Sequence, residues 1–104
     1  MFKIITFVPL KDKEVVKEAL FAAGAGTIGN YDHCCFETVG LGQFRPLDGS
    51  NPTLGVEGKT ETVEEVRIEM VYKGDKIDAV LKVLKHAHPY ETPAIDIIKL
   101  YNME

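Results

Sequence analysis

The chain lacks several features on which whole classes of protein depend. It has no tryptophan, only two cysteines, and more acidic than basic residues, which gives a formal net charge of −4 at pH 7. Proteins that bind nucleic acid or anionic lipid non-specifically need a basic surface to neutralise phosphates. We therefore expect neither nucleic acid nor a membrane surface among the partners of this chain.

Long apolar runs are missing as well. None of them approaches the ~20 residues that a membrane-spanning helix requires, and residues 1–5 do not begin a signal peptide. The two cysteines, Cys34 and Cys35, are neighbours, and neighbouring cysteines rarely form a disulfide because the closed ring strains the peptide. Free thiols without an export signal predict a cytoplasmic protein.

Three glycines, Gly24, Gly26 and Gly29, have the spacing of the GxGxxG motif, but their surroundings do not fit a dinucleotide site. In that motif the glycines follow a strand and open a helix, whose N-terminus faces the pyrophosphate. Here they close a predicted helix and lead into a strand. The sequence also contains no P-loop and no EF-hand spacing, so these nucleotide and calcium classes are not expected.

The patterns that are present alternate between strand and helix. Residues 2–8 are apolar on both alternating sets, which is typical of a central strand covered on both faces. Apolar residues at helical spacing predict two helices, for which Asp12 and Asp75 are the expected N-caps. The predicted strands cover residues 2–8, 33–40, 63–72 and 94–101, and the predicted helices cover residues 11–23 and 75–86.

This βαββαβ order predicts an α+β protein of the ferredoxin-like class, with a four-stranded antiparallel sheet and both helices on one face. Residues 1–104 are expected to form a single domain. The second face of the sheet would be bare in a monomer, yet the strands carry apolar residues on both faces, so we predict a homo-oligomer. Residues 41–62, rich in glycine and proline, are expected to form a long loop between the second and third strands.

Residues 86–93, His-Ala-His-Pro-Tyr-Glu-Thr-Pro, concentrate the groups that could do chemistry. One interpretation is that His86, His88 and Glu91 converge on a divalent metal ion, since imidazole suits zinc, copper and nickel and a carboxylate can complete the set. The other interpretation is a rigid corner without chemistry, in which Pro89 ends the helix. The spacing matches no recognised zinc signature, and both interpretations stay open.

A second candidate cluster, His33-Cys34-Cys35, falls on a predicted strand. Successive strand residues face opposite sides, so Cys34 and Cys35 cannot both face one ion. The topology also places this cluster at the end of the sheet opposite to residues 86–93. A Cys/His zinc site within one chain is therefore not expected, although the two clusters could meet across a subunit interface.

Several separated motifs carry a family resemblance. They are residues 24–32, 42–46, 49–52, 67–69 and 88–93, together with Phe36 and Gly55. These motifs resemble the YqfO-type domain, which is inserted in some Nif-three-like (NGG-one-interacting factor) proteins and also occurs as a free-standing protein.

The resemblance has consequences for fold and function. It implies a fold similar to those of the PII signalling proteins and the CutA copper-tolerance proteins, which are trimeric, and so favours a trimer over a dimer. It implies nothing of the two-metal activity of Nif-three-like proteins, which lies in another part of those proteins. By analogy with PII, residues 41–62 would correspond in position to a ligand-responsive loop.

Three hypotheses for function follow. The favoured one is a non-catalytic oligomeric module that binds a divalent metal ion at His86, His88 and Glu91, or a small ligand or protein partner, with Tyr90 and Arg45 as ligand contacts. The second is a small metal-dependent hydrolase with His86 or His88 as general base near Glu91. The third is a structural interaction domain without a ligand. No set of nucleophile, base and oxyanion hole is evident, which disfavours an enzyme.

Overall fold

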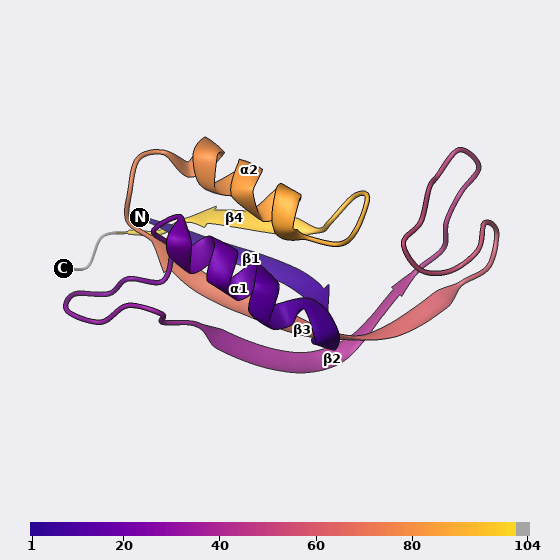
Figure 1. Ribbon diagram of the computed structural model, residues 1–104, viewed down its shortest axis with the longest axis horizontal. Helices are drawn as coiled ribbons and strands as arrows, with labels where there is room; N and C mark the ends of the chain where they lie inside the picture. Colours follow the sequence, from indigo (N-terminus) through magenta and orange to yellow (C-terminus); the bar gives the residue numbers. More distant parts are fainter. Residues whose placement is uncertain (102–104) are drawn as a thin grey trace.

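The computed structural model describes residues 1–101 and shows two layers, a four-stranded antiparallel sheet and two helices on one of its faces (Figure 1). The strand order is β2-β3-β1-β4, so the prediction of a ferredoxin-like α+β fold is confirmed. The elements are β1 Phe2–Pro9, the 3-10 helix η1 Leu10–Asp12, α1 Lys13–Ala22, β2 Phe36–Phe44, β3 Glu61–Tyr72, α2 Ile77–Ala87 and β4 Ile95–Lys99.

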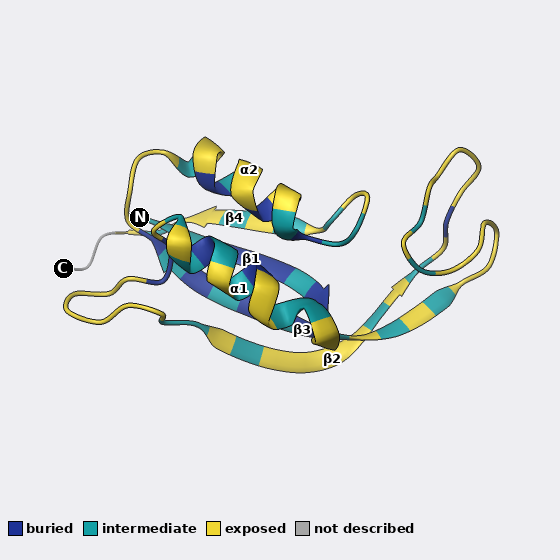
Figure 2. Cartoon of the chain, in the orientation of Figure 1, coloured by how far each residue is buried: buried dark blue, intermediate teal, exposed yellow. Residues whose placement is uncertain are grey.

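The hydrophobic core lies between the helices and the inner face of the sheet (Figure 2). Alternate residues of β3 from Val66 to Tyr72 are buried there, as the period of two along a strand predicts. The central strand β1 also buries Ile5, which points to the outer face and is 3% exposed. Each fully buried aliphatic side chain contributes about 1.5–3 kcal/mol. The fully buried aliphatic side chains of the core are Ile4, Val8, Val16, Leu20, Val66, Ile68, Val80 and Leu84.

Several strand boundaries differ from the sequence prediction, most of all those of β2. Residues 33–35 lie outside the strand, because His33 has a φ of 56° and the Cys34 N–H donates to the Gly26 carbonyl oxygen at 2.8 Å. At the other end, β2 and β3 stay paired as far as Phe44 and Glu61, so residues 41–44 and 61–62, which were predicted to lie in the loop, belong to the strands. Cross-strand pairing overrides the low strand propensity of the glycines there. The irregular loop is therefore residues 45–60.

Of the two predicted N-caps, Asp12 has the predicted position and Asp75 does not. Asp12 stands at the N-cap of α1 without a side-chain hydrogen bond, because η1 runs directly into the helix. The second helix begins at Ile77, so Lys76 and not Asp75 occupies its N-cap.

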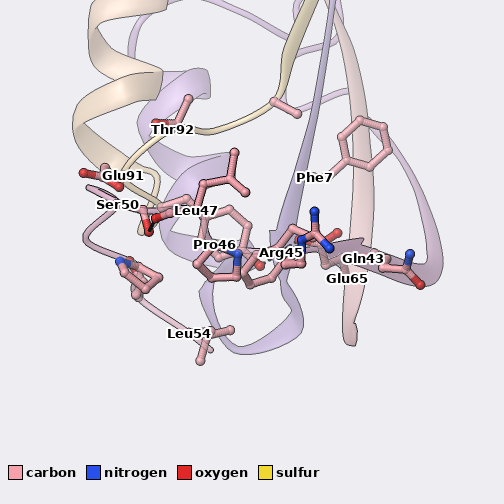
Figure 3. A pocket seen from close by; sticks show the side chains of 16 residues that line it. Phe7, Gln43, Arg45, Pro46, Leu47, Ser50, Leu54, Glu65, Glu91 and Thr92 are labelled. Atoms are coloured by element: carbon pink, nitrogen blue, oxygen red, sulfur yellow. Dashed lines mark hydrogen bonds between the residues drawn. The ribbon is translucent and has the colours of Figure 1, made fainter. Parts of the chain in front are cut away.

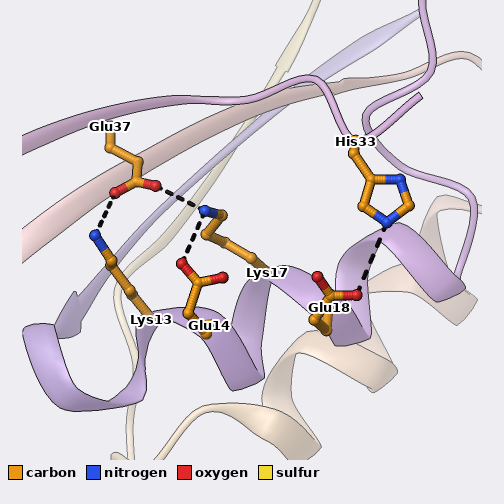
Figure 4. Close-up of polar contacts among 6 residues, drawn as sticks. All are labelled: Lys13, Glu14, Lys17, Glu18, His33 and Glu37. Carbon is orange, nitrogen blue, oxygen red and sulfur yellow. Dashed lines mark hydrogen bonds and ion pairs between the residues drawn. The ribbon is translucent and has the colours of Figure 1, made fainter. Parts of the chain in front are cut away.

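Glu37 fastens the edge strand β2 to α1 (Figure 4). Its carboxylate accepts hydrogen bonds from Lys17 Nζ at 2.7 Å and from Lys13 Nζ at 2.9 Å, and Lys17 also donates to Glu14 at 3.2 Å. The bond from Lys17, and then that from Lys13, holds the pKa of Glu37 below its usual range. These charge-assisted bonds fix the helical layer over β2.

The β2–β3 hairpin extends beyond the helices and makes the molecule elongated, at 47 × 24 × 23 Å (Figure 1). Residues 45–60 form its tip. This tip lies beside the connection between α2 and β4, residues 88–94, which we call the corner. This contact between the loop and the corner creates the candidate site.

Candidate functional site

A cleft of about 570 Å³ lies between the loop of residues 45–60, the corner and the outer face of the sheet (Figure 3). We call it the loop–corner cleft. Its volume is within the usual range for small-molecule sites. Its apolar lining comprises Phe7, Phe44, Pro46, Leu47, Pro52, Leu54 and Ala94. Its polar lining comprises Gln43, Arg45, Ser50, Thr53, Glu65, Tyr90, Glu91 and Thr92.

His88 anchors the corner to the sheet. Its side chain is buried, with Nε2 2.8 Å from the Phe7 carbonyl oxygen, while Nδ1 accepts the Tyr90 N–H at 3.2 Å. These two bonds define the neutral tautomer that carries its proton on Nε2. Burial lowers the pKa of His88, against the opposing effects of the Phe7 carbonyl and of the Glu65 and Asp12 carboxylates. His88 is therefore a neutral structural link at pH 7.

Pro89 explains why α2 ends where it does. His88 follows the last helical residue, Ala87, with φ −71° and ψ 134°. A residue before proline is driven out of the helical region into this extended conformation. The prediction that Pro89 ends the helix is confirmed.

Tyr90 joins the corner to β3. Its hydroxyl donates to Glu65 Oε2 at 2.7 Å, and its ring lies 6.3 Å from that of Phe44. Burial first, and then the hydrogen bond to Glu65, raises the pKa of Tyr90 above its usual range. Tyr90 is thus a neutral donor that holds the Glu65 carboxylate at the wall of the cleft.

Gly42 leaves the space that the Glu65 carboxylate occupies. A Cβ atom at position 42 would overlap Glu65 Oε1, whereas a Cβ at Gly40, on the same face of β2, would meet nothing within 4 Å. The glycine in this strand therefore marks a close approach to the carboxylate.

Two hydrogen bonds tie the loop to the corner. Glu91 Oε1 accepts the Asn51 N–H at 3.0 Å, and the Thr53 hydroxyl donates to the Pro89 carbonyl oxygen at 2.7 Å. Both bonds lie in exposed surroundings. The two walls of the cleft are therefore joined by a small number of solvent-accessible contacts, which cost little to break.

The structure does not bring the predicted metal ligands His86, His88 and Glu91 together. Both ring nitrogens of His88 are engaged with the backbone, and His86 is exposed on α2. Within residues 1–101 there is no group of three or more His, Cys, Asp or Glu side chains placed to hold a metal ion. The two predicted ligand contacts, Tyr90 and Arg45, do line one cleft.

We expect the variants His86→Ala and Glu91→Gln to take up as much zinc, copper or nickel as the wild-type chain. Both residues are on the surface, so the substitutions should leave the fold intact. Equilibrium dialysis with each metal measures the uptake. A loss of one equivalent in both variants would show that the predicted metal set assembles in solution.

The cluster His33-Cys34-Cys35 lies at the opposite end of the sheet. Cys34 is hydrogen-bonded to Gly26, which in turn donates to Val71 near the end of β3, whereas the corner contacts Phe7 and Glu65. The ring of His33 (Figure 4) packs on that of Phe21 at a tilt of 41°, with the ring centroids 4.5 Å apart. Burial raises the pKa of the Cys35 thiol. The predicted separation of the two clusters within a chain is confirmed.

Sequence reasoning did not single out Glu65, Gly42 or Phe44. Residues 42 and 44 fall in the predicted loop, and the predicted strand over residues 63–72 gave Glu65 no role at a site. Gly42 was the one available signal, since a glycine that lies inside a strand often marks a close approach.

The element order and the sheet topology define an α+β domain of the ferredoxin-like class. No protein-family model matches the chain. It is 46% identical over 103 residues to the GTP cyclohydrolase 1 type 2 homolog of Halalkalibacterium halodurans, a match that covers 98% of this chain and 27% of that protein.

Two solved structures illustrate the similarity. The Bacillus cereus protein related to NIF3 matches with a TM-score of 0.82 and 44% identity, over 97% of this chain and 26% of that one. The periplasmic divalent cation tolerance protein CutA from Archaeoglobus fulgidus matches with a TM-score of 0.69 and 22% identity, over 98% and 86% of the two chains. The second similarity concerns the fold alone.

These comparisons confirm the resemblance to the Nif-three-like (NIF3) proteins, of which this chain is a homologue over nearly its whole length. The chain spans about a quarter of the length of these relatives, 27% and 26% in the two cases. The cyclohydrolase activity in the name of the Halalkalibacterium halodurans relative therefore does not carry over to this chain. Neither helix within residues 1–101 has the length and apolar character that crossing a bilayer requires.

Proposed function

We propose that the chain is a non-catalytic, self-associating module that holds a small ligand in the loop–corner cleft. The observation that carries the proposal is the position of Arg45 and Tyr90, which line one apolar-walled cleft between the long loop and the corner. A largely apolar pocket with a few convergent polar groups is the usual form of a small-molecule site.

Arg45 supports the ligand proposal because its charge is not used internally. Its guanidinium has no ion pair or side-chain hydrogen bond with any of residues 1–101, and the residue is exposed at the end of β2. Arginine binds carboxylates and phosphates through paired N–H groups in a fixed fork geometry. An anionic group on a ligand would complete this arrangement.

Self-association is proposed from the outer face of the sheet. Phe36 and Ile98 point to this face and are 67% and 46% exposed, although Lys3, Arg67 and Glu69 form ion pairs between them. Exposed apolar side chains on both edge strands of an uncovered sheet face favour contact with a second copy. The resemblance to the trimeric PII and CutA proteins favours three copies over two.

The hydrolase alternative receives no support from the geometry. It needs His86 or His88 as a general base near Glu91, but the ring nitrogens of His88 hold backbone groups. A general base must lie within hydrogen-bond reach of the proton it removes. We therefore do not propose an activity for this chain, including the one named in its longer relatives.

The ligand proposal predicts that small molecules perturb the cleft and that Arg45 governs their affinity. Amide NMR spectra are recorded while an amino acid, a monocarboxylate, a sugar and a nucleotide are added in turn. At least one is expected to shift the amides of Phe44 and Tyr90, with tenfold weaker binding to Arg45→Ala, the loss of about 1.4 kcal/mol from one charge-assisted contact.

Lys59→Ala is the matched control, because Lys59 is an exposed cation on the same loop that does not line the cleft. Its affinity should equal that of the wild type. If no compound shifts the cleft amides, the chain is a structural interaction domain without a ligand here, and the proposal fails.

A further inference from the structure

The loop–corner cleft presents fixed charges of both signs. Arg45 comes from the end of β2 and Glu65 from the neighbouring strand β3, and both side chains line the same cleft (Figure 3). They form no ion pair with each other or with any other residue of the described range 1–101. An arginine and a carboxylate on one cleft that do not neutralise each other leave room for a ligand that neutralises both.

The Glu65 carboxylate is positioned and not merely exposed. It is half-buried, it accepts the Tyr90 hydroxyl at 2.7 Å, and the absence of a side chain at Gly42 makes space for its other oxygen. A partly buried carboxylate with only a neutral donor is stabilised further by a cation. Because no cation of residues 1–101 pairs with it, a cationic group on a ligand is the partner that fits.

The walls of the cleft around these charges are apolar and fit an apolar part of a ligand. Phe7, Phe44 and Leu54 line the cleft, and Pro46 between them is buried. The net charge of the lining is negative, since the lining contains one arginine, Arg45, and two carboxylates, those of Glu65 and Glu91. A ligand with several negative charges, such as a polyphosphate, would be repelled by those carboxylates.

We infer that the loop–corner cleft binds an α-amino acid with an apolar side chain, whose carboxylate pairs with Arg45, whose ammonium group pairs with Glu65, and whose side chain packs on the apolar walls. This inference rests on the proposed function and names its ligand class. A zwitterion alone satisfies both charges of the cleft without leaving either one desolvated and unpaired.

The test compares L-leucine with its two single-group analogues in isothermal titration calorimetry of the full chain. Isocaproate lacks the ammonium group and isoamylamine lacks the carboxylate. Loss of one charge-assisted contact is expected to weaken binding about tenfold or more in each case. L-Phenylalanine tests whether a second apolar side chain fits the walls of the cleft. A nucleoside triphosphate tests whether a ligand with several negative charges is repelled.

Two glycine variants supply a matched pair. Gly42→Ala should force the Glu65 carboxylate out of its position and weaken leucine binding about tenfold or more, the loss of one charge-assisted contact, with isocaproate binding unchanged. Gly40→Ala adds the same methyl group to the same face of β2 where nothing lies within 4 Å, and should bind leucine as the wild type does. Glu65→Gln, which keeps the shape of the side chain, repeats the test if Gly42→Ala does not fold.

The outcomes separate the two proposals. Isocaproate binding as tightly as leucine, or equal leucine binding by Glu65→Gln and wild type, would overturn the inferred ammonium contact. Tighter binding of the triphosphate would overturn the ligand class but leave a ligand-binding cleft. If none of the compounds binds in calorimetry, the ligand class is wrong. If in addition no compound of the NMR series shifts the amide signals of Phe44 and Tyr90, the proposed function is wrong as well.

Discussion

Replacement of His88 by alanine is expected to lower the free energy of unfolding by about 3 kcal/mol, because each buried backbone group left without a partner costs about 1–3 kcal/mol. The variant would leave the Phe7 carbonyl oxygen and the Tyr90 N–H without the hydrogen bonds that they make to His88. Urea unfolding followed by circular dichroism measures the change.

The Phe7 carbonyl has a specific need for His88. Strand β4 pairs with β1 only as far as Ile95 opposite Thr6, so the sheet ladder on that side ends one residue before Phe7. The His88 imidazole donates to the Phe7 carbonyl oxygen in place of a strand partner. A side chain that replaces a missing strand partner cannot be removed without exposing a buried acceptor.

His86→Ala is the matched control, since it removes the same side chain from an exposed position two residues earlier. Its effect should stay within about 0.5 kcal/mol, as for most surface substitutions. Equal losses in the two variants would show that His88 does not hold the corner.

The same residue predicts a pH dependence. Burial lowers the pKa of His88 in the folded chain below its ordinary value of 6.5, so the unfolded chain binds this proton first as the pH falls. The stabilisation is therefore complete above pH 6.5 and is lost progressively on acidification toward the folded pKa. The difference in stability between the wild type and His88→Ala should shrink below pH 6.5, whereas a constant difference would contradict the lowered pKa.

The fold could be predicted from the sequence because burial imposes a period on each element. Alternation along residues 65–72 identified the inner face of β3, and helical spacing identified α2 with its end at Pro89. These signals are local, and the βαββαβ order then leaves few topologies open. The same topology correctly separated the cysteines from the corner.

The cleft could be predicted only in part, because its contacts join residues that are distant in sequence. Arg45 and Tyr90 were predicted as ligand contacts, but the partner of Tyr90 is Glu65, 25 positions away, and that of Glu91 is the Asn51 N–H, 40 positions away. Such pairs depend on the path of the loop, which no local propensity fixes. The predicted metal ligands His86, His88 and Glu91 do not come together, because backbone groups engage both ring nitrogens of His88.

Phe36→Asp is expected to weaken self-association about thirtyfold, which corresponds to about 2 kcal/mol for an aromatic anchor of an interface. Phe36 begins β2 on the outer face of the sheet and leaves 67% of its surface exposed in the single chain. A charge there would have to be desolvated when a second copy covers the face. Light scattering over a concentration series measures the shift toward monomer.

Two further variants show whether burial of Phe36 is the cause. The carboxylate introduced by Phe36→Asp would face Glu69 across the strands, so Phe36→Lys, which would face the same glutamate with an opposite charge, separates interface burial from local repulsion. Oligomers of both Phe36 variants should dissociate into monomers. Val15→Asp introduces a negative charge at a residue 64% exposed on α1, in the other layer, and should leave the assembly intact. A monomeric wild type, or dissociation by Val15→Asp alone, would show that the outer face is not the contact between copies.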